Sequence, residues 1–195
     1  MSEKHFCPSC GEEVETVTIA YEKREEICCL YCGFPLQLVA IHHFSSQKSI
    51  IIVDDSKLLV AMIKEYFESN RLAKNIYCAY DGGEFLSEFV EKLRTSEEVG
   101  LILLDIIMPV LSGINAAIAM RSIEKGFAIE RIPILFFSAK RADESLVNAM
   151  KYCAPAHYIC KGVVNDQKEL CPRIYTVANN LLTLSQAKKE DSGSE

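Results

Sequence analysis

Five short apolar runs alternate with amphipathic segments along the chain after residue 48. Each run is too short for a helix and is apolar at consecutive positions. This pattern is typical of strands that are buried on both faces of a parallel sheet. We therefore predict strands at residues 50–53, 76–79, 101–104, 132–138 and 157–161.

The segments between these runs have apolar residues at spacings of three and four, which predicts helices with one buried face. The clearest start signal is Asp81-Gly-Gly-Glu84, which resembles a capping box. Strands that alternate with helices predict a doubly wound α/β fold with a five-stranded parallel sheet and right-handed crossovers. The helices are expected at about 59–67, 81–93, 113–125, 142–153 and 166–184.

The first 44 residues follow a different pattern, in which two Cys-x-x-Cys-Gly turns are separated by a stretch that alternates like a strand around Val17 and Ile19. Two such turns bring four thiolates together in a tetrahedron, which suits Zn²⁺. A unit this small buries little surface, so a bound metal would supply its folding energy. The segment resembles a zinc ribbon. The expected ligands are Cys7, Cys10, Cys29 and Cys32.

Alternatives to this ligand set remain open. Cys28 is able to replace Cys29, although Cys29 has the same spacing to Cys32 as Cys7 has to Cys10. A redox dithiol is the competing interpretation of the paired cysteines, but the doubled spacing favours metal.

Composition narrows the classes of function. The formal net charge is −6, and residues 1–46 hold seven acidic residues against three Lys or Arg, which is opposite to a nucleic-acid-binding surface. The start of the chain has no apolar signal core, and no apolar run approaches the roughly 20 residues that span a bilayer. We expect a cytoplasmic protein that does not insert into membranes.

Polar side chains follow several of the predicted strands at their carboxyl ends. In a flavodoxin-like strand order, which we adopt for five βα units, these ends meet where ligands bind. Clustered carboxylates favour Mg²⁺, and a lysine and a hydroxyl are suited to bind phosphoryl oxygens. The residues concerned are Asp54, Asp55, Asp105, Ser138 and Lys161.

These residues give the segment a family resemblance. The acidic pair Asp54-Asp55, the segment Asp105-x-x-Met108-Pro109-x-x-x-Gly113, Ser138-Ala139 and Lys161 occur in the order of the receiver domain of two-component response regulators, the family of the chemotaxis response regulator. The resemblance covers residues 49–184, about two-thirds of the chain.

The resemblance implies a mechanism. Asp105 would accept a phosphoryl group from a sensor histidine kinase or phosphotransfer protein. Mg²⁺ would be held by Asp54, Asp55, Asp105 and the backbone carbonyl of Ile107. Lys161 and Ser138 would bind the phosphoryl oxygens, and Tyr158 occupies the aromatic switch position that relays the change to an unknown downstream protein.

Two departures and three alternatives accompany this interpretation. Gly162 stands where the family usually has proline after the lysine, and Ser138 stands where threonine is frequent. The alternatives are a zinc-ribbon regulator of nucleic acid, a receiver used only for docking, and a hydrolase of the haloacid dehalogenase kind. The last lacks its Asp-x-Asp motif at Asp105, so we expect a phosphoacceptor and not an enzyme with separate substrate turnover.

The predicted organisation is therefore a zinc ribbon at 1–44, a linker at 45–48, a receiver at 49–184 and a flexible tail at 185–195.

Overall fold

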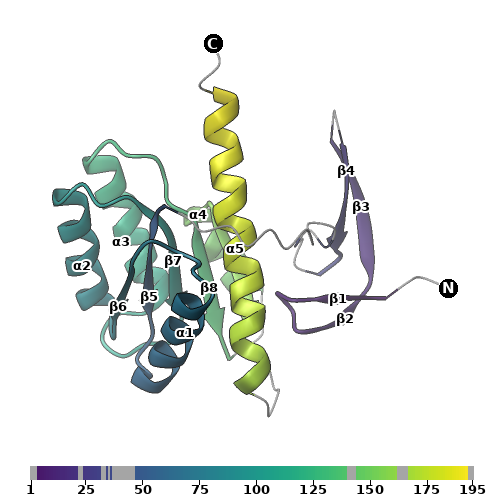
Figure 1. Cartoon of the computed structure of the whole chain (residues 1–195), viewed down its shortest axis with the longest axis horizontal. Coiled ribbons are helices and arrows are strands. Elements are labelled where there is room, and N and C mark those ends of the chain that lie inside the picture. Colours follow the sequence, from purple (N-terminus) through teal and green to yellow (C-terminus); the bar gives the residue numbers. More distant parts are fainter. Residues whose placement is uncertain are drawn as a thin grey trace.

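The computed structural model describes residues 4–21, 24–31, 34, 36, 47–139, 144–161 and 167–192. Residues 49–192 contain one five-stranded parallel sheet with helices on both faces, as Figure 1 shows. The strand order is β6-β5-β7-β8-β9, which is the flavodoxin-like order adopted above. The α/β fold predicted from the alternation of apolar runs and amphipathic segments is confirmed.

The strands of this sheet lie where the apolar runs predicted them. Small differences occur at the ends: β8 begins after Pro133, which has no N–H to donate to a neighbouring strand. The strands are β5 (Ser49–Val53), β6 (Ile76–Ala79), β7 (Val99–Asp105), β8 (Ile134–Ser138) and β9 (Ala156–Cys160).

The helices also match their predicted positions, with one longer than expected. The last helix continues to Ser192, into the segment that we predicted as a tail, because Ala187, Lys188 and Lys189 are good helix formers. The helices are α1 (Lys57–Ser69), α2 (Gly82–Arg94), α3 (Gly113–Gly126), α4 (Glu144–Tyr152) and α5 (Gln167–Ser192). Within the described residues, no helix has the length and apolar character needed to cross a membrane.

Each face of the sheet has its own hydrophobic core. Helices α1 and α5 cover one face, where Phe67 and Ile174 are fully buried against alternate residues of the central strands. Helices α2 and α3 cover the other, where Phe85 and Phe89 are fully buried. Each such side chain contributes roughly 1.5–3 kcal/mol. The two cores fix the carboxyl ends of the strands at one edge of the sheet.

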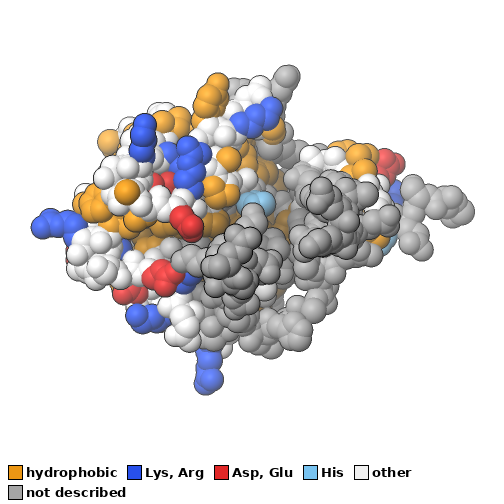
Figure 2. All heavy atoms as spheres, turned by 90° about the horizontal axis from the view of Figure 1, so that it is seen from above, with side chains coloured by type: hydrophobic (Ala, Val, Ile, Leu, Met, Phe, Trp, Pro, Cys, Tyr) orange, Lys and Arg blue, Asp and Glu red, His pale blue; other side chains and the backbone are white. Residues whose placement is uncertain are grey.

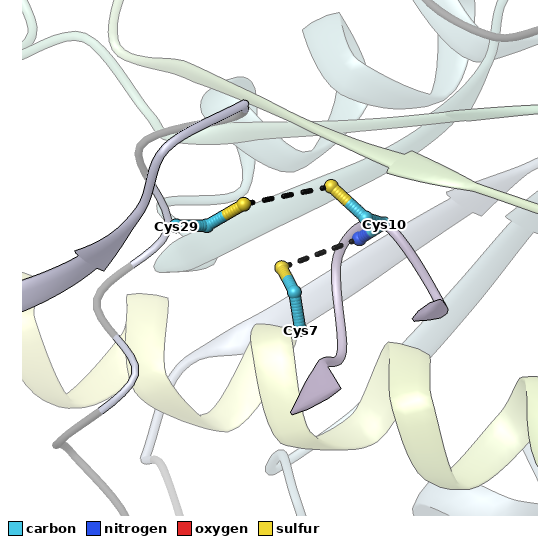
Figure 3. A group of neighbouring side chains, drawn as sticks. All are labelled: Cys7, Cys10 and Cys29. Carbon is cyan, nitrogen blue, oxygen red and sulfur yellow. Dashed lines mark hydrogen bonds between the residues drawn. The ribbon is translucent and has the colours of Figure 1, made fainter. Parts of the chain in front are cut away.

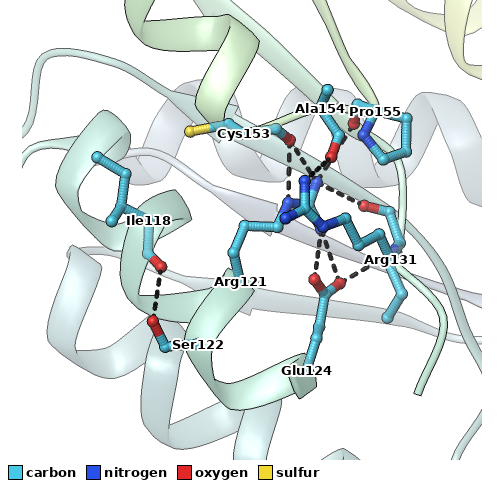
Figure 4. A network of polar contacts seen from close by, with 9 residues as sticks. Ile118, Arg121, Ser122, Glu124, Arg131, Cys153, Ala154 and Pro155 are labelled. Carbon is cyan, nitrogen blue, oxygen red and sulfur yellow. Dashed lines mark hydrogen bonds and ion pairs between the residues drawn. The ribbon is translucent and has the colours of Figure 1, made fainter. Parts of the chain in front are cut away.

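A buried ion pair lies on the side of the sheet that α2 and α3 cover (Figure 4). Arg121 of α3 contacts both carboxylate oxygens of Glu124 at 2.7 Å. Its other nitrogens donate to the carbonyls of Cys153 at 2.7 and 2.9 Å and of Ile132 at 2.9 Å. Arg121 therefore joins α3 to the chain segments that lead into β8 and β9.

The described part of the N-terminal unit contains two antiparallel pairs of strands. Strand β1 (His5–Cys7) pairs with β2 (Glu12–Val14), and β3 (Thr16–Tyr21) pairs with β4 (Arg24–Cys29). The strand predicted around Val17 is confirmed, whereas β4, which is rich in charge, was not predicted. Figure 1 shows these pairs of strands beside α5. Cys32 and the 45–46 part of the predicted linker lie outside the described residues.

Candidate functional site

The acidic pair follows β5 at the carboxyl edge of the sheet. Asp54 is 1% exposed, and its Oδ1 accepts a hydrogen bond from the backbone N–H of Ser56 at 2.8 Å. Ser56 is the N-cap of α1, and its side chain accepts from the N–H of Leu59. The capped helix start therefore holds Asp54 facing the site, while Asp55 lies exposed beside it.

Asp105 ends β7, the central strand of the sheet, and is 3% exposed. Its Oδ1 accepts from the N–H of Ile106 at 2.9 Å. Ile107 lies in the loop that follows, and its side chain is 60% exposed. A Cβ on Gly113 would lie 1.9 Å from the backbone oxygen of Asp105, so only glycine permits this loop to close beside the aspartate.

Lys161 joins the two buried carboxylates. Its Nζ lies 2.6 Å from Oδ2 of Asp54 and 3.0 Å from Oδ1 of Asp105. Its backbone N–H donates to the carbonyl of Ser138 at 2.8 Å, which extends the pairing of β9 with β8. Gly162 lies outside the described residues, yet the lysine before it reaches both aspartates.

Charge is concentrated at this edge. Carboxylate oxygens of Asp54, Asp55 and Asp105 lie within 4.8 Å of one another. Burial raises the pKa of Asp105 above its ordinary value, the Lys161 ammonium lowers it, and the Asp54 carboxylate raises it again. The group of oxygens fits a hard divalent cation such as Mg²⁺, which prefers oxygen ligands.

The remaining two predicted residues lie on β8 and β9. Ser138 is 1% exposed at the end of β8. Tyr158 is half-buried against the core under α2 and α3. Burial, together with the Cys160 thiol, raises the pKa of Tyr158. The structure therefore places a hydroxyl on the strand next to that of Asp105 and an aromatic ring on the strand beyond it.

The model of the response regulator receiver domain matches residues 50–175. The chain belongs to the response regulator receiver domain family.

Curated relatives of this receiver include the transcriptional regulatory proteins CrdR of Helicobacter pylori and CpxR of Escherichia coli K12. CrdR is 29% identical over 123 residues, which is 63% of this chain and 52% of CrdR. CpxR is 27% identical over 145 residues, which is 74% of this chain and 55% of CpxR. The chain thus spans about half the length of the curated relatives it matches.

Solved structures show the same fold. The receiver domain of the Francisella response regulator 1452 is 22% identical with a TM-score of 0.55, covering 71% of this chain and 99% of that one. A CheX-CheY complex with BeF₃ and Mg²⁺ from Borrelia burgdorferi is 22% identical with a TM-score of 0.51, covering 68% and 90%.

Outside the receiver, three of the predicted zinc ligands meet. The sulfurs of Cys7, Cys10 and Cys29 lie within 4.8 Å of one another and point toward a common centre (Figure 3). The Sγ atoms of Cys10 and Cys29 are 3.8 Å apart. It is Cys29 that joins the described cluster, and not Cys28 beside it.

The turn between Cys7 and Cys10 has a specific backbone. The N–H of Cys10 donates to Sγ of Cys7 at 3.4 Å, and the N–H of Gly11 donates to the carbonyl of Cys7 at 2.7 Å. Gly11 has φ +77°, which L side chains rarely adopt. This geometry explains the glycine after the first Cys-x-x-Cys pair and presents both thiols to one point.

Sequence reasoning missed two residues that link this turn to the receiver, Ser9 and Arg173. Ser9 is 3% exposed and its hydroxyl donates to the receiver, whereas Arg173 is 6% exposed and donates to carbonyls of both units. No local pattern marks them, because their partners in the other unit lie more than a hundred residues away along the chain.

Proposed function

We propose that the protein is a two-component response regulator that accepts a phosphoryl group from a histidine kinase on Asp105. The observation that carries this proposal is the contact of Lys161 with Asp54 and Asp105, both buried, at the carboxyl edge of a receiver sheet. In this proposal the Asp105 carboxylate is a phosphoacceptor, and the protein does not turn over a separate substrate.

The residues divide the work of the transfer. A carboxylate oxygen of Asp105 attacks phosphorus in line, so an O–P bond forms as the N–P bond to the kinase histidine breaks. The imidazole leaves and takes up a proton from solvent. Lys161 and the Ser138 hydroxyl hold the phosphoryl oxygens in place. Bound Mg²⁺ would neutralise the charge that develops on those oxygens, held by Asp54, Asp55, Asp105 and the Ile107 carbonyl.

Output then passes through protein contacts. The phosphoryl group adds roughly −1.5 to −2 charge beside Lys161 and Ser138. A shift of Ser138 toward that group makes room for Tyr158, which lies one strand away. The surface formed by α4, β9 and α5 would change for a downstream protein.

Intact mass spectrometry tests the phosphoacceptor. Full-length protein is incubated with Mg²⁺ and acetyl phosphate beside Asp105→Asn, with Asp81→Asn as control, because Asn also caps a helix well. One added phosphoryl group in the parent and control but not in Asp105→Asn is the expected result. An unmodified parent that still binds Mg²⁺ would favour a receiver used only for docking.

We further propose that Cys7, Cys10 and Cys29, with Cys32 as fourth ligand, bind a structural Zn²⁺. Three converging thiols and a Cys7 sulfur that accepts an N–H bond support this site. Zinc content measured by mass spectrometry is expected to be one per chain. It should be lost in Cys29→Ser and retained in Cys28→Ser; the reverse pattern would assign the ligand to Cys28.

Gene regulation is a second possible output, because the curated relatives are named transcriptional regulatory proteins. On the face in Figure 2, however, Lys and Arg side chains are dispersed and do not form one basic patch. Salt-dependent binding of duplex DNA by the full chain would establish this output.

A further inference from the structure

The turn that carries Cys7 and Cys10 is bonded to the outer edge of β9. The carbonyl of Ser9 accepts from the backbone N–H of Cys160 at 3.1 Å. The Ser9 hydroxyl donates to the carbonyl of Tyr158. The turn therefore continues the hydrogen bonding of the receiver sheet beyond its last strand.

Arg173 of α5 fastens the same junction from the side of the helix. Its Nε donates to the carbonyl of Pro8 at 3.0 Å, and its Nη2 donates to the carbonyls of Ser9 at 3.3 Å and Cys160 at 2.9 Å. The guanidinium also lies where a Cβ on Gly11 would be, 2.5 Å from its Cζ. A buried cation needs such hydrogen bonds, so this placement is specific.

These contacts connect the cysteine cluster to the acidic cluster through only a few residues. On one side, Pro8 and Ser9 lie between the two cysteines. On the other side, Cys160 directly precedes Lys161, whose ammonium contacts Asp54 and Asp105. A displacement of the turn therefore acts on the residue next to the lysine of the acidic site.

The same junction borders the residue at the switch position. A cavity of about 340 Å³ lies beside this junction, and residues of the N-terminal unit, α4 and β9 line it. Tyr31 and Phe34 line it from one side, and Met150 and Tyr158 line it from the other. A change in the side-chain position of Tyr158 would therefore alter the cavity that Tyr31 and Phe34 of the N-terminal unit also line.

We propose that the cysteine turn is an internal binding partner of the β9 edge, and that metal at the cysteines and phosphoryl at Asp105 are positively coupled through Ser9, Cys160 and Arg173. This inference rests on the proposed function of both sites. Zinc fixes the turn, the docked turn fixes the end of β9, and that position keeps Lys161 in reach of Asp105. Linkage then requires that each ligand tightens the other by the same factor.

A binding experiment on the full chain tests the coupling. Affinity for beryllofluoride, a mimic of the phosphoryl group, is measured by calorimetry at fixed Mg²⁺, with zinc bound and after removal by a zinc-selective chelator. We expect zinc to tighten binding by about five-fold or more. Equal affinities, or weaker binding with zinc, would overturn the proposal.

Substitution of Arg173 tests whether the coupling between zinc and beryllofluoride binding passes through the contacts of the cysteine turn with β9 and α5. Arg173→Met keeps the apolar stem but loses the donors, and the zinc-dependent factor is expected to fall to about one while each site still binds its ligand. The control Arg94→Met lies at the exposed end of α2 and should keep the parent's factor. A full factor in Arg173→Met contradicts the proposed route.

Hydrogen exchange on the parent needs no variant. Removing zinc is expected to speed exchange in β9, where Cys160 donates to the turn, and to leave β6 at the opposite edge unchanged. Unaltered exchange in β9 would contradict docking by the turn. A parent that binds neither zinc nor beryllofluoride would instead contradict the proposed function, and the coupling with it.

Discussion

Lys161 holds the carboxylate of Asp54 at 2.6 Å, closer than it holds that of Asp105. The ammonium therefore contacts a carboxylate that also belongs to the acidic cluster proposed for Mg²⁺. Under the proposed function, Lys161 and Mg²⁺ would compete for Asp54, and both would be needed around the phosphoryl group.

This competition predicts opposite effects of one substitution. Lys161→Met removes a positive charge next to the metal site and frees Asp54, so Mg²⁺ should bind more tightly by about 1 kcal/mol or more. Phosphorylation by acetyl phosphate should become slower, because a cation that holds the phosphoryl oxygens is lost. Calorimetry and intact mass measure the two effects; weaker Mg²⁺ binding would contradict the competition.

The ionised carboxylate of Asp105 is expected to lower the free energy of unfolding. Because its pKa is raised by burial in the folded state, unfolding free energy falls as the pH rises through that pKa and the carboxylate ionises. Asp105→Asn should therefore stabilise the metal-free protein by about 0.5–2 kcal/mol at neutral pH. In urea titrations the advantage should shrink at acidic pH. A stability gain of Asp105→Asn that increases at acidic pH would contradict a raised pKa for Asp105.

Val110 carries backbone strain in the loop after β7. Its φ is +65° and its side chain is fully exposed at 101%, so the β-branched residue pays for a left-handed conformation without packing in return. Val110→Asn should raise unfolding free energy by about 1 kcal/mol, since asparagine tolerates this region. Thermal unfolding measures it, with exposed Val147→Asn in helix α4 as a control that should not stabilise.

The buried pair of Arg121 and Glu124 is expected to be sensitive to loss of one partner. Arg121→Ala leaves the Glu124 carboxylate buried at 1% exposure, which typically costs about 3–5 kcal/mol. Arg131→Ala, which removes an exposed donor to the carbonyl of Ala154, should cost far less. Equal losses in denaturant titrations would show that burial of the pair is not what matters.

The fold was predictable because apolar runs and helical periodicity are local patterns. The alignment of Asp54, Asp105, Ser138 and Lys161 followed from their positions at strand ends, once a strand order was adopted. Gly113 was visible only as a motif position, and the structure adds the reason, which is the nearby carbonyl of Asp105.

What the sequence did not reveal depends on long-range contacts. Arg121 and Glu124 have the spacing of an ordinary surface pair on a helix, and only the tertiary fold buries them. Arg173 similarly resembles a solvent-exposed helix residue. Strand β4 was missed since Arg24, Glu25 and Glu26 have low strand propensity, and pairing with β3 overrides it.

The bond between Ser9 and Cys160 has a consequence for how the molecules behave toward one another. An open edge strand is a template onto which a strand of another chain can add. The cysteine turn covers part of that edge on β9 with its own backbone and a serine hydroxyl. If the cysteines bind zinc as proposed, loss of the metal would uncover this part of the β9 edge, and strand addition between copies of the chain would become easier.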